Sequence, residues 1–248
     1  QWIAQEDGLE ELNLTSNGSQ LPKLAPALKA AGVSLLNISL DSLQADRFKA
    51  LTRTGDLAQV LAGVDAAREQ GFKRIRLNSV ILKGRNEDEV PALLDYALNR
   101  GLDMAFIEEM PLGQIQDRHR GEAFLSSAQL REQVETQFQL VPATETSAGP
   151  ARFWRVPGFD SRIGFISPHS ENFCASCNRV RVTVEGRLLL CLGNEHSVDL
   201  KPLLRDHPDS DAPLAEAIVA AMAIKPERHH FTHEPEEQLV RFMNMTGG

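Results

Sequence analysis

Cysteine is scarce in this sequence, acidic residues outnumber basic ones, and long apolar runs are missing. Three cysteines in 248 residues are too few, and odd in number, for a disulfide scaffold, which predicts a reducing compartment, the cytoplasm. The longest uninterrupted apolar run covers residues 217–224, far short of the ~20 residues of a membrane span, so no membrane partner is expected. With 26 Lys and Arg against 34 Asp and Glu, the net charge of −8 argues against a general nucleic-acid coat but leaves room for a local basic site.

The remaining composition is that of an ordinary globular protein, with 42% apolar and 24% charged residues. Dividing the length by ~150 residues per domain predicts one large domain or two modest ones, with enough chain to bury a core. The sequence starts at Gln1 without a signal-peptide pattern, and residues 1–8 resemble the end of a helix. We therefore expect an N-terminal portion to precede this sequence.

The first half of the chain alternates strand-like and helix-like segments. Apolar runs at residues 9–14, 34–40, 74–82 and 103–109 predict strands, and residues 21–31, 57–70 and 87–100 predict helices, each followed by glycine as a stop signal. This order is typical of an α/β fold with a parallel sheet, and the irregular unit length favours a (β/α) barrel. Polar residues follow all four predicted strands. A single such residue is as easily a helix cap, but four successive strand ends of this kind favour a site at the common mouth of the barrel.

Arg76 lies within one of these predicted strands. Alternation places Arg74, Arg76 and Asn78 on one face, which in a barrel is the interior. A cation there needs an anionic partner, which is either a ligand phosphate or a protein carboxylate, Glu108 or Glu109.

The pattern changes after about residue 144. A small-residue linker at 147–150 precedes three expected antiparallel segments, 153–156, 162–166 and 180–192, the last folded at a two-residue turn formed by Glu185 and Gly186. A helix is expected at 214–224, followed by a polar tail. We therefore predict two domains, a partial barrel over residues 1–146 and a C-terminal extension over residues 147–248.

All three cysteines fall in this extension. Cys174 and Cys177 form a C-x₂-C pair, and the predicted turn places Cys191 opposite Val180 on the returning strand. Three thiolates can hold a [4Fe–4S] cluster with one iron left open to substrate, or, with His169 or His196, a structural zinc ion. The third possibility is a small group of redox-active or buried thiols.

Two arginines follow the C-x₂-C pair. Alternation points Cys177, Arg179 and Arg181 to one side, which puts two guanidinium groups beside the metal. Such forked donors suit phosphate oxygens or a purine edge, although pairing with barrel carboxylates is the ordinary alternative. Together with Arg76 they indicate an anionic ligand, a nucleotide, between the barrel mouth and the hairpin.

Five segments resemble one known family. They are LTSNG (14–18), NISLDSL (37–43), FIEEM (106–110), FCASCNRVR (173–181) and the terminal pair Gly247 and Gly248. In this order they resemble the GTP 3′,8-cyclase family of molybdenum cofactor biosynthesis, within the radical S-adenosylmethionine (SAM) superfamily. The resemblance covers essentially the whole chain.

The resemblance implies an incomplete TIM-type barrel with a C-terminal extension and two [4Fe–4S] clusters. The first cluster, on a C-x₃-C-x₂-C motif, would cleave SAM to a radical that removes hydrogen from the ribose 3′ carbon of GTP. The carbon radical would then attack guanine C8 and give (8S)-3′,8-cyclo-7,8-dihydroguanosine 5′-triphosphate. Implied partners are GTP, SAM, an external electron donor, cyclic pyranopterin monophosphate synthase and a second copy in a homodimer.

The resemblance also implies roles for individual residues. Cys174, Cys177 and Cys191 would hold the second cluster. The expected contacts of GTP are Thr15, Arg76, Arg179, Val180 and Arg181. Ser39 and Met110 would contact SAM, and the tail of Gly247 and Gly248 would thread toward the active site, where a residue without a side chain can pass closely.

The sequence departs from the family in two respects. The C-x₃-C-x₂-C motif is absent, so this chain alone is expected to be inactive. Arg76 stands where the family commonly has lysine, which replaces a point charge with a planar fork. A peptide-modifying radical SAM enzyme and a zinc-stabilised nucleotide-binding module are the alternative functions.

Overall fold

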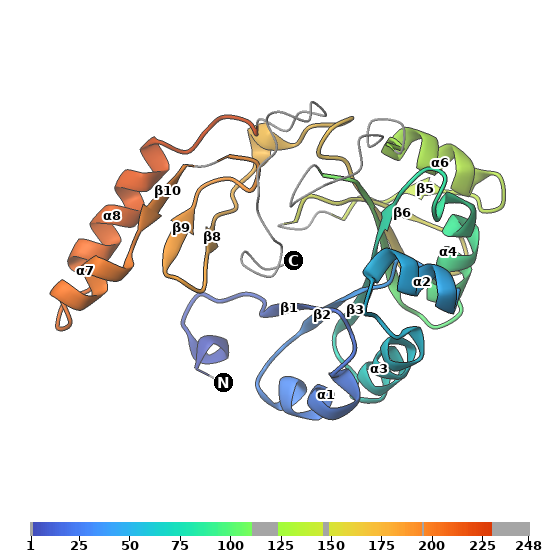
Figure 1. The fold of residues 1–248 in the computed structure, drawn as a ribbon, viewed down its shortest axis with the longest axis horizontal. Coiled ribbons are helices and arrows are strands. Elements are labelled where there is room, and N and C mark those ends of the chain that lie inside the picture. Colours follow the sequence, from blue (N-terminus) through green and yellow to red (C-terminus); the bar gives the residue numbers. More distant parts are fainter. Residues whose placement is uncertain (1, 111–123, 146–148, 195, 230–248) are drawn as a thin grey trace. The chain divides into compact units, whose positions relative to one another are not determined.

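The protein is described here by a computed structural model that covers residues 2–110, 124–145, 149–194 and 196–229 (Figure 1). Two compact units divide the chain. The first comprises residues 1–109 and 122–170, and the second comprises residues 110–121 and 171–248. None of the described helices has the length and hydropathy to cross a bilayer.

A seven-stranded sheet forms the first unit, in the order β1-β2-β3-β4-β7-β6-β5. Its strands are β1 (Asn13–Ser16), β2 (Leu35–Ser39), β3 (Arg74–Ile81), β4 (Asp103–Glu108), β5 (Val141–Pro142), β6 (Arg152–Arg155) and β7 (Arg162–Ile166). Strands β1 to β4 and β7 are parallel, while β5 and β6 run antiparallel. The two edge strands, β1 and β5, do not pair with each other, so the sheet is open and does not close into a barrel. The predicted α/β fold, a partial barrel, is confirmed.

Strands β6 and β7 lie elsewhere than the sequence suggested. Both were expected in the C-terminal extension, yet β7 pairs with β4 and β6 pairs with β7, so both belong to the sheet of the first unit. Hydrogen bonding to an exposed strand edge, which the sequence does not reveal, decides this placement. The functional division into residues 1–146 and 147–248 stays a prediction.

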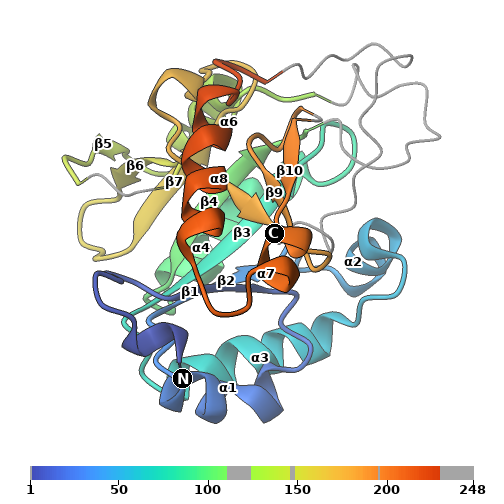
Figure 2. The same ribbon diagram turned by 90° about the vertical axis from the view of Figure 1, so that its left-hand side faces the viewer.

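Helices cover one side of this sheet (Figures 1 and 2). They are α1 (Leu21–Ala30), α2 (Ala45–Thr52), α3 (Leu57–Glu69), α4 (Val90–Leu98) and α6 (Ser127–Glu135). The sequence predicted α1, α3 and α4 but not α2 or α6. A capping box of Ser126 and Gln129 starts α6, a signal that is visible in the sequence. Instead of a helix end, the first residues form a short 3₁₀ turn, Ile3–Gln5, and β1 begins later than the predicted strand at 9–14.

Alternation along β3 separates the core from the interior face. Ile75, Leu77 and Ile81 are buried with the helices, whereas Arg74, Arg76 and Asn78 are half-buried on the other face. Close packing of α3 depends on glycine, since a Cβ on Gly63 would lie 2.2 Å from the carbonyl oxygen of Gly18. Arg74, Arg76 and Asn78 therefore face away from the helices.

The second unit contains a three-stranded antiparallel sheet, in the order β10-β9-β8. Its elements are β8 (Arg181–Val182), β9 (Arg187–Leu189), β10 (Ser197–Asp199), α7 (Lys201–Asp206) and α8 (Ala212–Ala223). Leu188, Leu190, Leu200 and Ala221 form its small core.

The register of the β8–β9 hairpin corrects the prediction. The Thr183 N–H donates to the Arg187 carbonyl, and Arg181 pairs with Leu189, so three residues, 184–186, form the loop instead of two. Gly186 closes it with a φ of 83°, as in a turn followed by a bulge. Continued outward, this register places Leu190, not Cys191, opposite Val180, so the predicted register was wrong by one residue.

Candidate functional site

One row of polar side chains crosses the sheet of the first unit. In register, Thr15 of β1 pairs with Asn37 of β2, Asn37 pairs with Arg76 of β3, and Arg76 pairs with Asp103 of β4. Side chains at paired positions of parallel strands share a face, so these four residues lie side by side, away from the helices. The structure thus brings together Thr15 and Arg76, two of the predicted GTP contacts, and inserts Asn37 between them.

Arg76 has no carboxylate partner among the described residues. Its Nε donates to Asn78 Oδ1 at 3.1 Å. Burial lowers the pKa of Arg76, an effect that the charge of Asp103 opposes and that of Arg162 reinforces. The suggested ion pair with Glu108 is wrong, because other donors surround that carboxylate. A half-buried guanidinium with only an amide partner remains able to bind an anion.

The Asp103 carboxylate instead forms ion pairs with two other arginines. Its carboxylate accepts bonds from Arg74 Nη1 at 3.0 Å and from Arg162 Nε and Nη2 at 2.9 and 2.7 Å, and from the Arg162 N–H at 2.8 Å. With three arginines on this face and Asp103 shared by two of them, the row keeps an excess of positive charge. Such a surface favours an anionic ligand.

Glu108 ends β4 and is fully buried. It accepts bonds from the backbone N–H groups of Ser127 at 2.7 Å, His169 at 3.0 Å and Ser170 at 3.1 Å, and from the Ser170 hydroxyl. The carboxylate therefore ties β4 to the start of α6 and to the segment after β7. Its role is structural.

The carboxyl edge of the sheet carries the predicted SAM contacts. Ser39 is the last residue of β2, and Met110 follows β4 by two residues. Asp41, two residues beyond Ser39, accepts a bond from the Val80 N–H at 2.8 Å, while Asn86 Nδ2 donates to the Asp41 and Val80 carbonyls. Burial raises the pKa of Asp41 from 3.8 to about 6, against the lowering effect of the Val80 hydrogen bond.

Asp41→Asn is expected to stabilise the protein at neutral pH. Since the folded pKa exceeds the unfolded one, the wild type loses stability as the pH rises from about 4 to above 6, whereas asparagine keeps the acceptor for Val80 without a buried charge. The variant should gain about 1–3 kcal/mol at pH 7.5 and almost nothing below pH 4. Urea unfolding across this pH range measures it, with Asp46→Asn on the exposed side of α2 as the control. An equal gain at every pH would show that the charge is not the cause.

The cysteines lie in the second unit. Cys174 and Cys177 flank a 3₁₀ turn in which the Cys177 N–H donates to the Cys174 carbonyl at 3.0 Å, and Cys191 follows β9. All three side chains are half-buried and none is in a disulfide. Burial raises the pKa of the Cys177 thiol, but hydrogen bonds from the Arg179 backbone and guanidinium, with the charges of Arg179 and Lys225, outweigh it and lower the pKa.

Three thiols, one with a lowered pKa, fit the donor chemistry of an iron–sulfur cluster. No three Cys, His, Asp or Glu side chains of the described residues are placed to hold one metal ion together. Neither of the two histidines suggested as a fourth zinc ligand forms such a group with the cysteines in the described part of the chain. His169 belongs to the first unit, and His196 Nδ1 lies against Asn194 Oδ1.

The alternation after Cys177 is confirmed. Cys177, Arg179 and Arg181 are half-buried, whereas Asn178 and Val180 are exposed. Arg179 Nη2 lies 3.4 Å from Cys177 Sγ, and its guanidinium carbon lies 4.7 Å from the centre of the Phe173 ring. A cation is thus held beside a thiol.

Sequence reasoning missed Lys225, which follows α8. Its Nζ donates to the Arg179 carbonyl at 2.9 Å and to the Leu190 carbonyl at 2.6 Å, so it joins the segment of Cys177 to that of Cys191. The only sequence signal is a lysine directly after an apolar helix. Asn37 and Asp103 were also missed.

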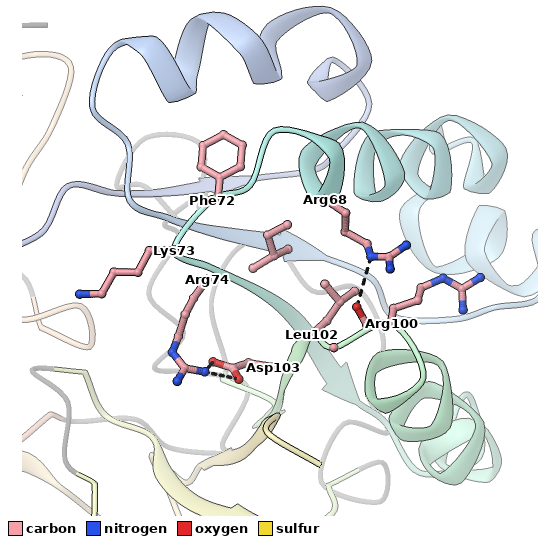
Figure 3. A pocket seen from close by; sticks show the side chains of 9 residues that line it. Arg68, Phe72, Lys73, Arg74, Arg100, Leu102 and Asp103 are labelled. Carbon is pink, nitrogen blue, oxygen red and sulfur yellow. Dashed lines mark hydrogen bonds and ion pairs between the residues drawn. The ribbon is translucent and has the colours of Figure 1, made fainter.

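A cavity of about 250 Å³ lies at the amino ends of β3 and β4 (Figure 3). Arg74 and Asp103, the first residues of these strands, line it together with Arg68, in the last turn of α3, and Arg100, which follows α4. Arg68 Nε donates to the Arg100 carbonyl, and Arg74 is paired with Asp103. It is at the opposite edge of the sheet from Ser39 and Asp41, and it shares Arg74 and Asp103 with the face of the polar row. Gly247 and Gly248 lie outside the described residues.

Comparison with known proteins identifies the family of this chain. The family model described as Molybdenum Cofactor Synthesis C matches residues 102–231, and that of the Radical SAM superfamily matches residues 3–97. A GTP 3′,8-cyclase of Pseudomonas entomophila (strain L48) is 63% identical over 247 residues, which cover 99% of this chain and 74% of the relative. The chain belongs to the GTP 3′,8-cyclase family.

Other members of the GTP 3′,8-cyclase family match equally broadly. The enzyme of Marinobacter nauticus is 58% identical over 241 residues, covering 97% of this chain and 73% of the relative. A solved radical SAM methyltransferase from Sphaerobacter thermophilus covers 62% of this chain and 40% of its own, at 16% identity and a TM-score of 0.39, too low to support an argument.

Membership of the GTP 3′,8-cyclase family makes this a radical SAM enzyme of molybdenum cofactor biosynthesis. The superfamily works with a [4Fe–4S] cluster and SAM. The chain spans about three quarters of the length of these relatives. Its three cysteines are all in the second unit, so no residue of this chain forms the C-x₃-C-x₂-C motif of a SAM-cleaving cluster.

Proposed function

We propose that this chain carries the GTP-binding part of a lyase that cyclises GTP to (8S)-3′,8-cyclo-7,8-dihydroguanosine 5′-triphosphate. The observation that carries the proposal is the contact of Arg179 with Cys177, which holds a guanidinium beside a thiol of the three-cysteine set. A structural zinc site has no need of such a cation, whereas a cluster that receives a nucleotide does.

Each unit contributes its own residues to this function. In the second unit, Cys174, Cys177 and Cys191 hold a [4Fe–4S] cluster, and Arg179 and Arg181 donate to GTP. Val180 points to the opposite side of the segment, where it is 40% exposed, so its contribution to GTP binding comes from its backbone.

In the first unit, Thr15 and Arg76 bind GTP and Ser39 binds SAM. Met110, the first residue assigned to the second unit, also binds SAM. The excess positive charge around Arg76 supports this assignment. Gly247 and Gly248, which lie outside the described residues, are proposed to contribute to the active site.

SAM and the first cluster, whose C-x₃-C-x₂-C motif this chain does not carry, would supply the one-electron chemistry that opens a C–H bond of the ribose. Residues of this chain position the nucleotide and neutralise its phosphates. The chain alone is expected to bind GTP without cyclising it. An external electron donor, a downstream cyclic pyranopterin monophosphate synthase and a second copy in a homodimer are further proposed partners, and the cytoplasm is the proposed compartment, suited to thiols outside disulfides.

Arg179→Ala and Arg181→Ala test the proposal. Each should weaken GTP binding at least about tenfold, because a charge-assisted hydrogen bond to phosphate is lost, with iron and sulfide content unchanged. Calorimetric titration of anaerobically purified protein with GTP measures the affinity, and iron and sulfide are determined on the same samples. Arg205→Ala on exposed α7 is the matched control.

Four outcomes contradict the proposal. Loss of metal in either variant would make the arginines structural, and unchanged GTP affinity would remove them from the site. If the wild type contains zinc without sulfide, the zinc-stabilised binding module takes precedence. If the wild type holds iron but binds no GTP, a peptide-modifying enzyme is the better interpretation.

A further inference from the structure

Asn37 stands between two residues proposed to bind the nucleotide. It pairs in register with Thr15 on one side and Arg76 on the other. Its chain neighbours Leu36 and Ile38 are fully buried in the core under the helices. Alternation therefore directs the Asn37 side chain to the interior face, together with Thr15 and Arg76.

The Asn37 carboxamide is buried, and its hydrogen-bonding capacity is largely unused within the described part of the chain. The residue is only 8% exposed, and its Oδ1 is buried without a hydrogen-bond donor in the described part of the chain. Its Nδ2 donates to Thr15 Oγ1 at 3.4 Å, a long contact. Proteins keep few buried acceptors unpaired, because desolvation is not compensated, and each one that persists needs a reason.

Neighbouring donors on the same face are engaged elsewhere. Arg76 Nε donates to Asn78, and Arg74 and Arg162 donate to Asp103. Asn37 Oδ1, which has no donor among the described residues, thus lies on the strand next to that of Arg76, ~4.8 Å away. Arg76 in turn has no carboxylate partner among these residues. This pair complements a ligand that carries a hydroxyl donor close to anionic oxygens, as a ribose phosphate does.

We propose that Asn37 accepts a hydrogen bond from a ribose hydroxyl of the bound nucleotide and so orients the sugar for hydrogen removal. The proposal rests on the proposed function. Ser39, the SAM contact, lies two residues beyond Asn37 on the same face. Because the hydrogen is taken from the ribose by a group derived from SAM, the sugar must lie beside the SAM site, and Asn37 is the buried acceptor nearest to Ser39 along β2.

A cycle of one substitution and three nucleotides tests this. Anaerobically purified wild type, Asn37→Ala and the control Asn99→Ala, which loses only an exposed amide on the end of α4, are titrated with GTP, 2′-deoxy-GTP and 3′-deoxy-GTP. The wild type should bind GTP about tenfold more tightly than one of the deoxynucleotides, the difference of one hydrogen bond. Asn37→Ala should bind GTP about tenfold more weakly and lose that discrimination, whereas Asn99→Ala should match the wild type.

The outcomes separate the two proposals. If the wild type does not bind GTP, the proposed function fails. If it binds GTP and both deoxynucleotides equally, or if Asn37→Ala keeps the discrimination, the role of Asn37 is refuted while the function stands. Should Asn37→Ala not fold, as judged by circular dichroism, the comparison of the three nucleotides on the wild type decides alone.

Discussion

Cys177→Ser is expected to remove the iron–sulfur cluster and, with it, measurable GTP binding. A hydroxyl does not replace a thiolate as an iron ligand at neutral pH, and Cys177 is the thiol whose pKa the Arg179 contacts already lower. Anaerobically prepared wild type should contain about four iron and four sulfide per chain, and the variant well under one of each. Iron, acid-labile sulfide and zinc assays measure this. Cys174→Ser and Cys191→Ser should behave alike.

The matched control is Ser176→Ala, in the same turn as Cys174 and Cys177. It removes a bond from the Ser176 hydroxyl to the Phe173 carbonyl without touching a thiol. The control should retain the cluster, and all variants should keep the circular dichroism of the first unit, whose core contains no cysteine. A cysteine variant with full iron and sulfide would remove that residue from the ligand set. One zinc per wild-type chain without sulfide would make the three thiols a structural site.

Glu108→Ala is expected to cost about 3–5 kcal/mol of unfolding free energy. The buried carboxylate accepts three backbone N–H groups and one hydroxyl, and truncation leaves these donors buried without an acceptor. Glu108→Gln should cost less than alanine, because one amide oxygen remains, yet more than about 1 kcal/mol, because its NH₂ faces donors. Urea unfolding measures both.

Glu135→Ala, on the exposed end of α6, serves as the control and should change stability by less than about 0.5 kcal/mol. If Glu108→Ala is as stable as the control, the carboxylate does not hold β4, α6 and the segment after β7 together. The result also bears on how strand ends are interpreted. Glu108 stands at the end of an apolar strand, where a binding-site residue is also expected. Both of its carboxylate oxygens, however, accept hydrogen bonds from neighbouring residues.

Local patterns predicted the first unit well. Alternation in β3 separated Arg76 from the core, and glycine stops bounded α1, α3 and α4. The pattern of Cys177, Arg179 and Arg181 was equally reliable, because period-two alternation depends on the chain alone. These features use residues adjacent in sequence.

Contacts between distant residues were harder. The sequence suggested Glu108 or Glu109 as the carboxylate partner of Arg76, because it does not show which donors fold against each carboxylate. Backbone N–H groups of α6 and of the segment after β7 donate hydrogen bonds to Glu108. The guanidinium groups of Arg74 and Arg162 donate to Asp103. The hairpin register was off by one because loop length depends on the positive φ that Gly186 adopts, not on the presence of glycine.

The sequence by itself determined the α/β class, the open barrel, the three-cysteine set and the family, since motif spacing and periodicity survive without knowledge of contacts. Only the tertiary structure decided that β6 and β7 complete the sheet and that Lys225 joins the segments of Cys177 and Cys191. It also decided that Asn37 is buried between Thr15 and Arg76, with no donor to its Oδ1 among the residues that the structure describes. The reason is physical. Whether a polar atom is satisfied depends on which strand lies beside it, and strand pairing joins residues that are tens of positions apart.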